Sequence, residues 1–166
     1  MIHIILFHPE IPQNTGNILR TAMATNSFVH IIGPIPFDIS DKALQRAGMD
    51  YIKDAKFDYY GSYEEFAEKF KDKKIYYVTK YGENVYSRVD LSDPTEDVYV
   101  MFGRESTGID KEILSAHKDT TLRIPMISTA RSLNLANSVS IVVYEILRQQ
   151  NYPNLATFDM IKKYKI

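Results

Sequence analysis

The chain has no cysteine among its 166 residues. Without thiols it can form neither disulfides nor thiolate metal sites. No run approaches the ~20 apolar residues that a membrane span needs. The first residues offer neither a basic leader nor a long apolar stretch, so we do not expect secretion. These absences predict a cytoplasmic protein.

An excess of positive charge is also missing. Lys and Arg total 20, Asp and Glu total 21, and the net charge is −1. This balance argues against a protein that coats nucleic acid through its overall field, although it leaves room for a local basic patch. Any RNA substrate would be held by a few placed contacts, or by patches that two subunits combine. The length fits one domain spanning residues 1–166.

Several catalytic signatures are absent as well. The chain contains no G-x-x-x-x-G-K-[ST] phosphate loop and no G-x-S-x-G nucleophile turn. Its four histidines are not spaced as metal ligands. We therefore expect structural roles for the histidines and no metal cofactor.

Apolar runs rich in β-branched and aromatic residues alternate with helical patterns along the chain. Such alternation predicts an α/β fold, Rossmann-like, with a mainly parallel sheet and helices on both faces. Residues 81–95 hold Gly, Asn, Asp and Pro and predict a long mobile loop. The expected strands are residues 2–7, 28–32, 57–60, 75–79, 98–102 and 121–124, and the expected helices are residues 14–25, 38–46, 62–70, 110–117 and 133–149.

Three polar clusters follow predicted strands. They are N-T-G-N-I-L-R at residues 14–20, F-G-R-E-S-T-G-I at residues 102–109, and I-P-M at residues 124–126 with S-L-N-L-A-N at residues 132–137. Loops at the carboxyl ends of parallel strands meet at one edge of the sheet and form the ligand site. The clusters therefore predict one composite site.

Each cluster also has a local interpretation. At 3.6 residues per turn, Asn14, Asn17, Arg20 and Thr21 share one arc of a helix, so amides and a guanidinium can face a ligand. Gly103 at a strand end can leave backbone surface for a flat ligand. Ser132 can cap the last helix, which would place Asn134 on that helix's polar arc.

Taken together, the three clusters resemble the SPOUT superfamily of S-adenosylmethionine-dependent RNA methyltransferases. The resemblance spans residues 2 to about 152 and is greatest to the small single-domain branch that 2′-O-methylates the wobble nucleotide of certain tRNAs. It implies a deep trefoil knot in the C-terminal third, which sequence patterns alone do not predict. Arg104 departs from the small residue or proline that the family usually carries there, and it can contact RNA or only solvent.

The resemblance also implies site residues. Backbone groups around Val78, Gly103 and Ile124, with Ser132, would hold S-adenosyl-L-methionine. The implied catalytic residues are Arg20, Asn14, Glu105, Ser132 and Asn134. Because a guanidinium is effectively always protonated, orienting the ribose or phosphate suits Arg20 better than acting as a base.

The expected activity is methylation of the 2′-oxygen of nucleotide 34, cytidine or modified uridine, in leucine tRNAs. Two alternatives remain: a relative that acts on ribosomal RNA or on another tRNA position, and a non-catalytic RNA-binding protein that keeps the fold. Candidate RNA contacts are Arg20, Lys42, Arg46, Arg131 and the lysines at positions 162, 163 and 165.

The last predicted helix indicates a homodimer. One arc of it is apolar throughout, whereas Ile141 and Tyr144 lie on the opposite arc, which should otherwise be wet. Large apolar side chains on such a face call for a partner, and a second copy is the simplest one. The resemblance implies a dimer too. Because one nearly neutral copy has too little net charge to capture a tRNA through its field, we also predict that the site is completed across the interface.

Overall fold

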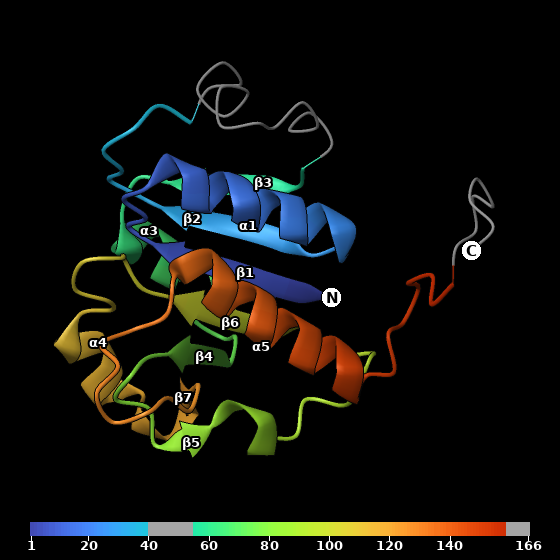
Figure 1. Cartoon of the computed structure of the whole chain (residues 1–166). Coiled ribbons are helices and arrows are strands. Elements are labelled where there is room, and N and C mark those ends of the chain that lie inside the picture. Colours follow the sequence, from blue (N-terminus) through green and yellow to red (C-terminus); the bar gives the residue numbers. More distant parts are fainter. Residues whose placement is uncertain (40–54, 159–166) are drawn as a thin grey trace.

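The computed structural model describes residues 1–39 and 55–158 of the chain. Within them, one sheet lies between two layers of helices (Figure 1). Its strands are β1 (Ile2–Phe7), β2 (Phe28–Ile32), β3 (Phe57–Tyr60), β4 (Ile75–Val78), β5 (Asn84–Val85), β6 (Val98–Phe102) and β7 (Thr121–Arg123). The helices are α1 (Pro12–Ala24), α3 (Tyr63–Lys69), α4 (Lys111–Ala116) and α5 (Leu135–Gln149), with 3₁₀ turns η2 (Tyr86–Arg88) and η3 (Lys118–Thr120).

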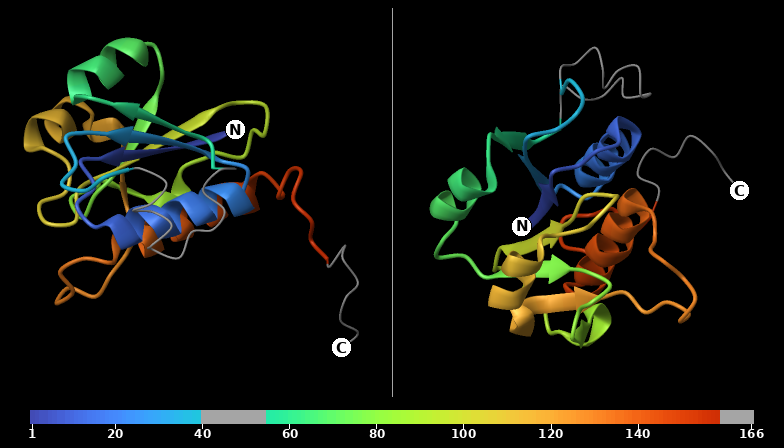
Figure 2. Two further views of the ribbon diagram at one scale, coloured as in Figure 1. Left: turned by 90° about the horizontal axis from the view of Figure 1, so that it is seen from above. Right: turned by 90° about the vertical axis from the view of Figure 1, so that its left-hand side faces the viewer.

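The pairs between these seven strands are all parallel, in the order β3-β2-β1-β6-β4-β7-β5. The predicted fold class is confirmed. α1 and α5 cover one face of the sheet, and α3 and α4 cover the other (Figure 2). No helix among the described residues has the length and apolar character needed to cross a membrane.

The central strands are buried on both faces, which explains their continuous apolar runs. In β1, Ile4 and Leu6 point to the core under α1 and α5, whereas Ile5 and Phe7 point to the core under α3 and α4. This alternation is the two-residue period of a strand. On the first face, α5 contributes the predicted apolar arc, and all its members are buried: Leu135, Ala136, Val139, Val142, Val143, Ile146 and Leu147.

The segment after β4 wraps around β7. β7 pairs with β4 on one side and β5 on the other, although β5 precedes it by more than thirty residues in the chain. Gly82 lies so close to β7 that a Cβ there would fall 2.4 Å from the carbonyl carbon of Leu122. The expectation that residues 81–95 are irregular throughout is therefore wrong, because β5 and η2 form within them. Two residues are too few for strand periodicity to be visible, and β5 exists only through its pairing with β7.

Helix ends differ from the sequence predictions by at most two residues among the described helices. α1 begins at Pro12 rather than residue 14, since proline suits the first helical turn. Asn134, not Ser132, caps α5, and its side chain accepts a hydrogen bond from the Asn137 N–H at 3.2 Å. Asp110 occupies the N-cap position of α4 without a side-chain cap bond. The helix predicted at residues 38–46, with Lys42 and Arg46, lies largely outside the described residues, as do the three lysines near the C-terminus.

Candidate functional site

A cavity of about 570 Å³ opens at the carboxyl edge of the sheet. Segments that follow β4, β6 and β7 form its walls, together with the starts of α1 and α5. It is lined by Ile11, Asn14, Val78, Thr79, Lys80, Tyr81, Phe102, Gly103, Arg104, Glu105, Ser106, Thr107, Gly108, Ile109, Ile124, Met126, Ser132, Leu133, Asn134, Leu135 and Ser138.

The cavity brings together the predicted site residues from all three clusters. Every predicted cofactor-binding residue lines it: Val78, Gly103, Ile124 and Ser132. Of the predicted catalytic residues, Asn14, Glu105, Ser132 and Asn134 line it as well, and Arg20 does not. The convergence follows from topology, since parallel strands bring their carboxyl ends to one edge.

Three polar side chains in the cavity wall form a continuous hydrogen-bond chain. The Asn14 amide nitrogen donates to Glu105 Oε1 at 2.9 Å. The Asn134 amide nitrogen in turn donates to Asn14 Oδ1 at 3.0 Å. One residue from each cluster therefore takes part, and the chain holds the three loops in a fixed arrangement.

The Glu105 carboxylate is fully engaged by the start of α1. Besides Asn14, it accepts the backbone N–H groups of Glu10 at 2.8 Å and Ile11 at 3.2 Å. A carboxylate in this position satisfies N–H groups at a helix start and is stabilised by the helix dipole. With three donors on two oxygens, Glu105 acts as a brace between loops rather than as a free base.

Gly103 also has a structural role within its own loop. A Cβ on it would lie 2.3 Å from the carbonyl carbon of Gly108, so the missing side chain allows the loop to fold back on itself. Gly108 has a φ of 78°, a conformation that favours glycine. Its N–H donates to the carbonyl of Arg104 at 2.9 Å. The glycines of this cluster therefore build the tight turn, and the cavity wall results from it.

Arg104 belongs to the same loop. Its guanidinium donates to Asp110 Oδ1 at 2.7 Å and lies 5.0 Å from the centre of the Phe7 ring. An ion pair combined with stacking on an aromatic face holds an arginine firmly. The structure thus gives Arg104 a place in the loop's own framework.

Arg20 lies outside the cavity, on the exposed side of α1. The expected polar arc of α1 is only partly correct, because Asn14 is buried at 6% exposure whereas Asn17 and Arg20 face solvent. Periodicity alone could not separate them, since the partners that bury Asn14 lie about 90 and 120 residues away along the chain.

Sequence reasoning missed several residues at and near the cavity. Among the lining residues, Thr79, Lys80 and Tyr81 follow β4 directly, and this position was the available signal. Glu10 was also missed. Its carboxylate accepts both the backbone N–H and the hydroxyl of Ser106, at 2.9 and 2.8 Å.

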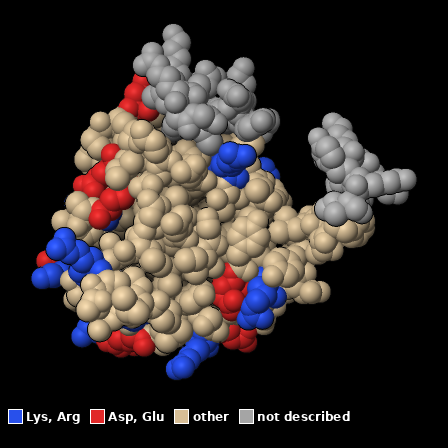
Figure 3. Space-filling view, in the orientation of Figure 1, with Lys and Arg blue, Asp and Glu red and all other residues tan. Residues whose placement is uncertain are grey.

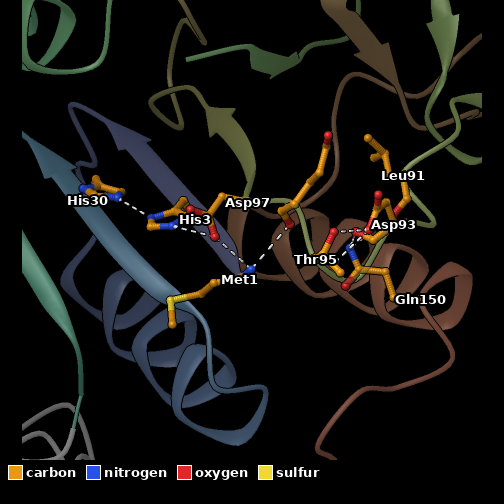
Figure 4. A network of polar contacts seen from close by, with 9 residues as sticks. Met1, His3, His30, Leu91, Asp93, Thr95, Asp97 and Gln150 are labelled. Carbon is orange, nitrogen blue, oxygen red and sulfur yellow. Dashed lines mark hydrogen bonds and ion pairs between the residues drawn. The ribbon is translucent and has the colours of Figure 1, made fainter. Parts of the chain in front are cut away.

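A second polar network lies away from the cavity, and Figure 4 shows its contact between His3 on β1 and His30 on β2. His3 Nδ1 lies 2.9 Å from His30 Nε2, and His30 Nδ1 lies 3.1 Å from the Tyr60 hydroxyl. The hydroxyl donates to Asp58 at 3.2 Å. Burial, reinforced by the neighbouring His3, lowers the pKa of His30 from 6.5 to about 4. The expected structural role suits this neutral pair, of which His30 is buried and His3 half-buried.

Among the residues described, no three His, Asp or Glu side chains gather as a metal site would require. The cavity does suit a nucleoside cofactor, because its volume is typical of a ligand pocket. Val78, Ile124 and Leu135 provide apolar walls, and Ser132 and Ser138 provide hydroxyl groups.

Comparison with known proteins supports this interpretation. The tRNA (cytidine(34)-2′-O)-methyltransferase of Escherichia coli strain K12 is 40% identical over 160 residues, which cover 96% of this chain and 100% of the relative. A provisionally assigned RNA methyltransferase from Bacillus anthracis matches with a TM-score of 0.89 and 48% identity, over 93% of this chain and 98% of that one.

A third match is a structure solved to explain 2′-OH methylation of C/U34 on tRNA. It has a TM-score of 0.83 and 37% identity, over 91% of this chain and 97% of that one. The model of the SpoU rRNA methylase family matches residues 1–144. This chain is therefore an S-adenosylmethionine-dependent methyltransferase that belongs to the SpoU family of the SPOUT superfamily.

Proposed function

We propose that the chain methylates the 2′-oxygen of nucleotide 34, cytidine or modified uridine, in leucine tRNAs. The observation that carries this proposal is the end-to-end similarity to the Escherichia coli tRNA methyltransferase, with all three cavity-forming clusters present. The family's own description names ribosomal RNA, so a ribosomal target is the second candidate. A tRNA substrate would place the protein in the cytoplasm.

The cavity is the proposed cofactor site. Backbone groups around Val78, Gly103 and Ile124, with the Ser132 hydroxyl, would hold S-adenosylmethionine. When bound, this cofactor supplies a methyl group on a positively charged sulfur. The chain's contribution is to position the ribose oxygen in line with that methyl and to exclude water.

The polar residues of the cavity wall stabilise the relative arrangement of the three loops. Glu105, Asn14 and Asn134 use their hydrogen-bonding groups on one another and on the backbone, so they keep the three loops in register. Arg20 would orient the ribose or phosphate of the RNA, because a permanently charged guanidinium binds such oxygens well.

A homodimer explains how Arg20 could act although it lies outside its own chain's cavity. Ile141 and Tyr144 on α5 are 37% and 48% exposed. Few charged side chains lie over α1 and α5 in the middle of this face (Figure 3). α1 packs beside α5, where Thr21 and Ser140 place their hydroxyls 3.4 Å apart. A second copy on this face would therefore lie close to Arg20, and Arg20 of one subunit could act at the cavity of the other.

The direct test is methyl transfer from radiolabelled cofactor to total tRNA from cells that lack this protein. We expect label in leucine tRNAs at nucleotide 34, and no label when that nucleotide carries a deoxyribose, because the accepting 2′-hydroxyl is then missing. Deproteinised ribosomal RNA from the same cells serves as the competing substrate. Label in ribosomal RNA alone, or none in either, would overturn the proposal.

A further inference from the structure

Two glutamates connect the segment before α1 to the loop after β6. Each carboxylate accepts hydrogen bonds from the segment that carries the other glutamate. The Glu10 carboxylate accepts the N–H of Ser106 at 2.9 Å and its hydroxyl at 2.8 Å. In return, the Glu105 carboxylate accepts the N–H groups of Glu10 at 2.8 Å and Ile11 at 3.2 Å. Four hydrogen bonds therefore tie together two backbone segments that lie about 95 residues apart in the chain.

The two carboxylates serve different segments. Glu105 also binds Asn14, so it belongs to the network that fixes the start of α1. Glu10 holds only the loop, and it does so at Ser106, between the carbonyl of Arg104 and the turn at Gly108. Both donors of Ser106 point to this one side chain, so a single residue controls how the middle of the loop is oriented.

That part of the loop is a wall of the cavity. Ser106, Thr107 and Gly108 all line it, and Ser106 and Thr107 are exposed. Exposed loop residues with few buried contacts open easily when a tie is lost, because water can replace the missing partner. Without Glu10, the remaining bond from Gly108 to Arg104 would close the turn but leave Ser106 free to reorient.

We propose that Glu10 is a positioning residue that keeps the loop of residues 104–108 in the conformation that the cofactor binds. The inference rests on the proposed assignment of the cavity as the cofactor site. Glu10 acts through Ser106 and does not itself need to touch the cofactor. Without Glu10, the loop would become ordered only when the cofactor binds. The entropic cost of this ordering would weaken the affinity for the cofactor by about tenfold or more. Turnover at saturating cofactor would stay within about twofold of the wild type.

The experiment measures the affinity for S-adenosylhomocysteine by calorimetry and, in parallel, the KM for the cofactor and kcat. Glu10→Ala removes both acceptor oxygens and should bind about tenfold more weakly. Glu10→Gln keeps a carbonyl oxygen for the Ser106 N–H and can donate its NH₂ to the Ser106 hydroxyl, so it should lose much less affinity. Ser106→Ala removes only the hydroxyl bond and should have a smaller effect. In a Glu10→Ala background, Ser106→Ala should cause no further loss. Glu112→Ala, an exposed glutamate on α4, is the matched control.

The outcomes separate this inference from the assignment beneath it. If the wild type fails to bind S-adenosylhomocysteine, the assignment of the cavity as the cofactor site is wrong. If the wild type binds and Glu10→Ala binds equally tightly, Glu10 has no positioning role. A lower melting temperature with unchanged affinity would make Glu10 a stabilising brace only and would also overturn the proposal. Should Glu10→Ala fail to fold, Glu10→Met decides the question, because it keeps the length of the side chain without its carboxylate oxygens.

Discussion

Asn134 donates a hydrogen bond to Asn14 across 3.0 Å and so joins the beginnings of two helices that are 120 residues apart in the chain. Asn14 passes the connection on to Glu105. The three loops of the cavity therefore depend on the side chain of one buried asparagine. Its carboxamide is well suited to this position, because it donates to a carboxylate and accepts from another amide at the same time.

Asn14→Ala should lower the free energy of unfolding by about 1–3 kcal/mol, because it leaves groups of Glu105 and Asn134 without their partner. It should also reduce methyl transfer by about 100-fold through misplacement of the loops. Urea unfolding and initial rates provide the measurements. A double-mutant cycle with Asn134→Ala should give a coupling energy of about 0.5–3 kcal/mol; strict additivity would mean that the bond contributes nothing.

Gly82→Ala should destabilise the protein by at least ~2 kcal/mol. The new Cβ would lie 2.4 Å from the backbone of Leu122, so either β7 or the preceding loop must shift. Gly61→Ala is the matched control, since its Cβ would only approach the flexible Glu65 side chain at 3.4 Å. Urea midpoints of the two variants test the prediction. Similar midpoints would show that the loop has room around β7.

Acid should destabilise the protein through His30. Its pKa is about 4 in the folded protein and 6.5 when unfolded, so the unfolded chain binds the proton more tightly. The stability that neutral His30 contributes is complete above pH 6.5 and decreases as the pH falls from 6.5 toward 4. Urea midpoints measured between pH 7.5 and 5.5 should decrease in the wild type as the pH is lowered. In His30→Asn they should decrease less steeply. Parallel slopes for the two proteins would exclude His30 as the source.

Tyr144→Asp should shift the protein toward the monomer in analytical ultracentrifugation. A carboxylate on the exposed face of α5 would have to be buried in the proposed interface at a high cost. Glu64→Lys on α3, which covers the other face of the sheet, should leave the sedimentation unchanged. A wild-type protein that sediments as a monomer at micromolar concentration would contradict the dimer.

Arg20→Ala should abolish methyl transfer and leave cofactor affinity nearly unchanged, because Arg20 does not line the cavity of its own chain. Arg20→Lys should also fail if the planar guanidinium is needed. Mixed dimers identify the cavity that Arg20 serves. The second chain carries Ser132→Trp, which places a bulky ring at the cavity wall and should stop cofactor binding.

If Arg20 acts on the partner's cavity, the mixed dimer holds one complete site: the free cavity of the Arg20→Ala chain and the intact arginine of the other chain. Activity should then return to a substantial fraction of the wild type in heterodimers purified by two tags. If Arg20 serves its own chain, neither site is complete and the heterodimer stays inactive. An active Arg20→Ala homodimer would remove Arg20 from the mechanism altogether.

Much of the fold could be predicted from local patterns. The bounds of β1, β2 and β6 agree with the apolar runs, because strands buried on both faces must be largely apolar. The bounds of β3 also agree, although it is an edge strand with Asp58 and Tyr59 exposed. The helix predicted at residues 62–70 corresponds to α3, and Ser62 caps it by accepting the Glu65 N–H at 3.2 Å. The meeting of the three clusters was also predictable, because it requires only that the strands run parallel. The trefoil knot stays a prediction from the family.

The tertiary structure alone decided which partner each polar side chain has. Periodicity placed Asn14 beside Arg20, whereas contacts with distant residues bury the first and leave the second in solvent. The same holds for Glu10 and Glu105, whose partners are about 95 residues away, and for β5, which exists only beside β7. Local patterns record whether a residue prefers water or the core. They do not show which distant residue a polar side chain will bind. The two partners of such a hydrogen bond meet only when the intervening chain folds.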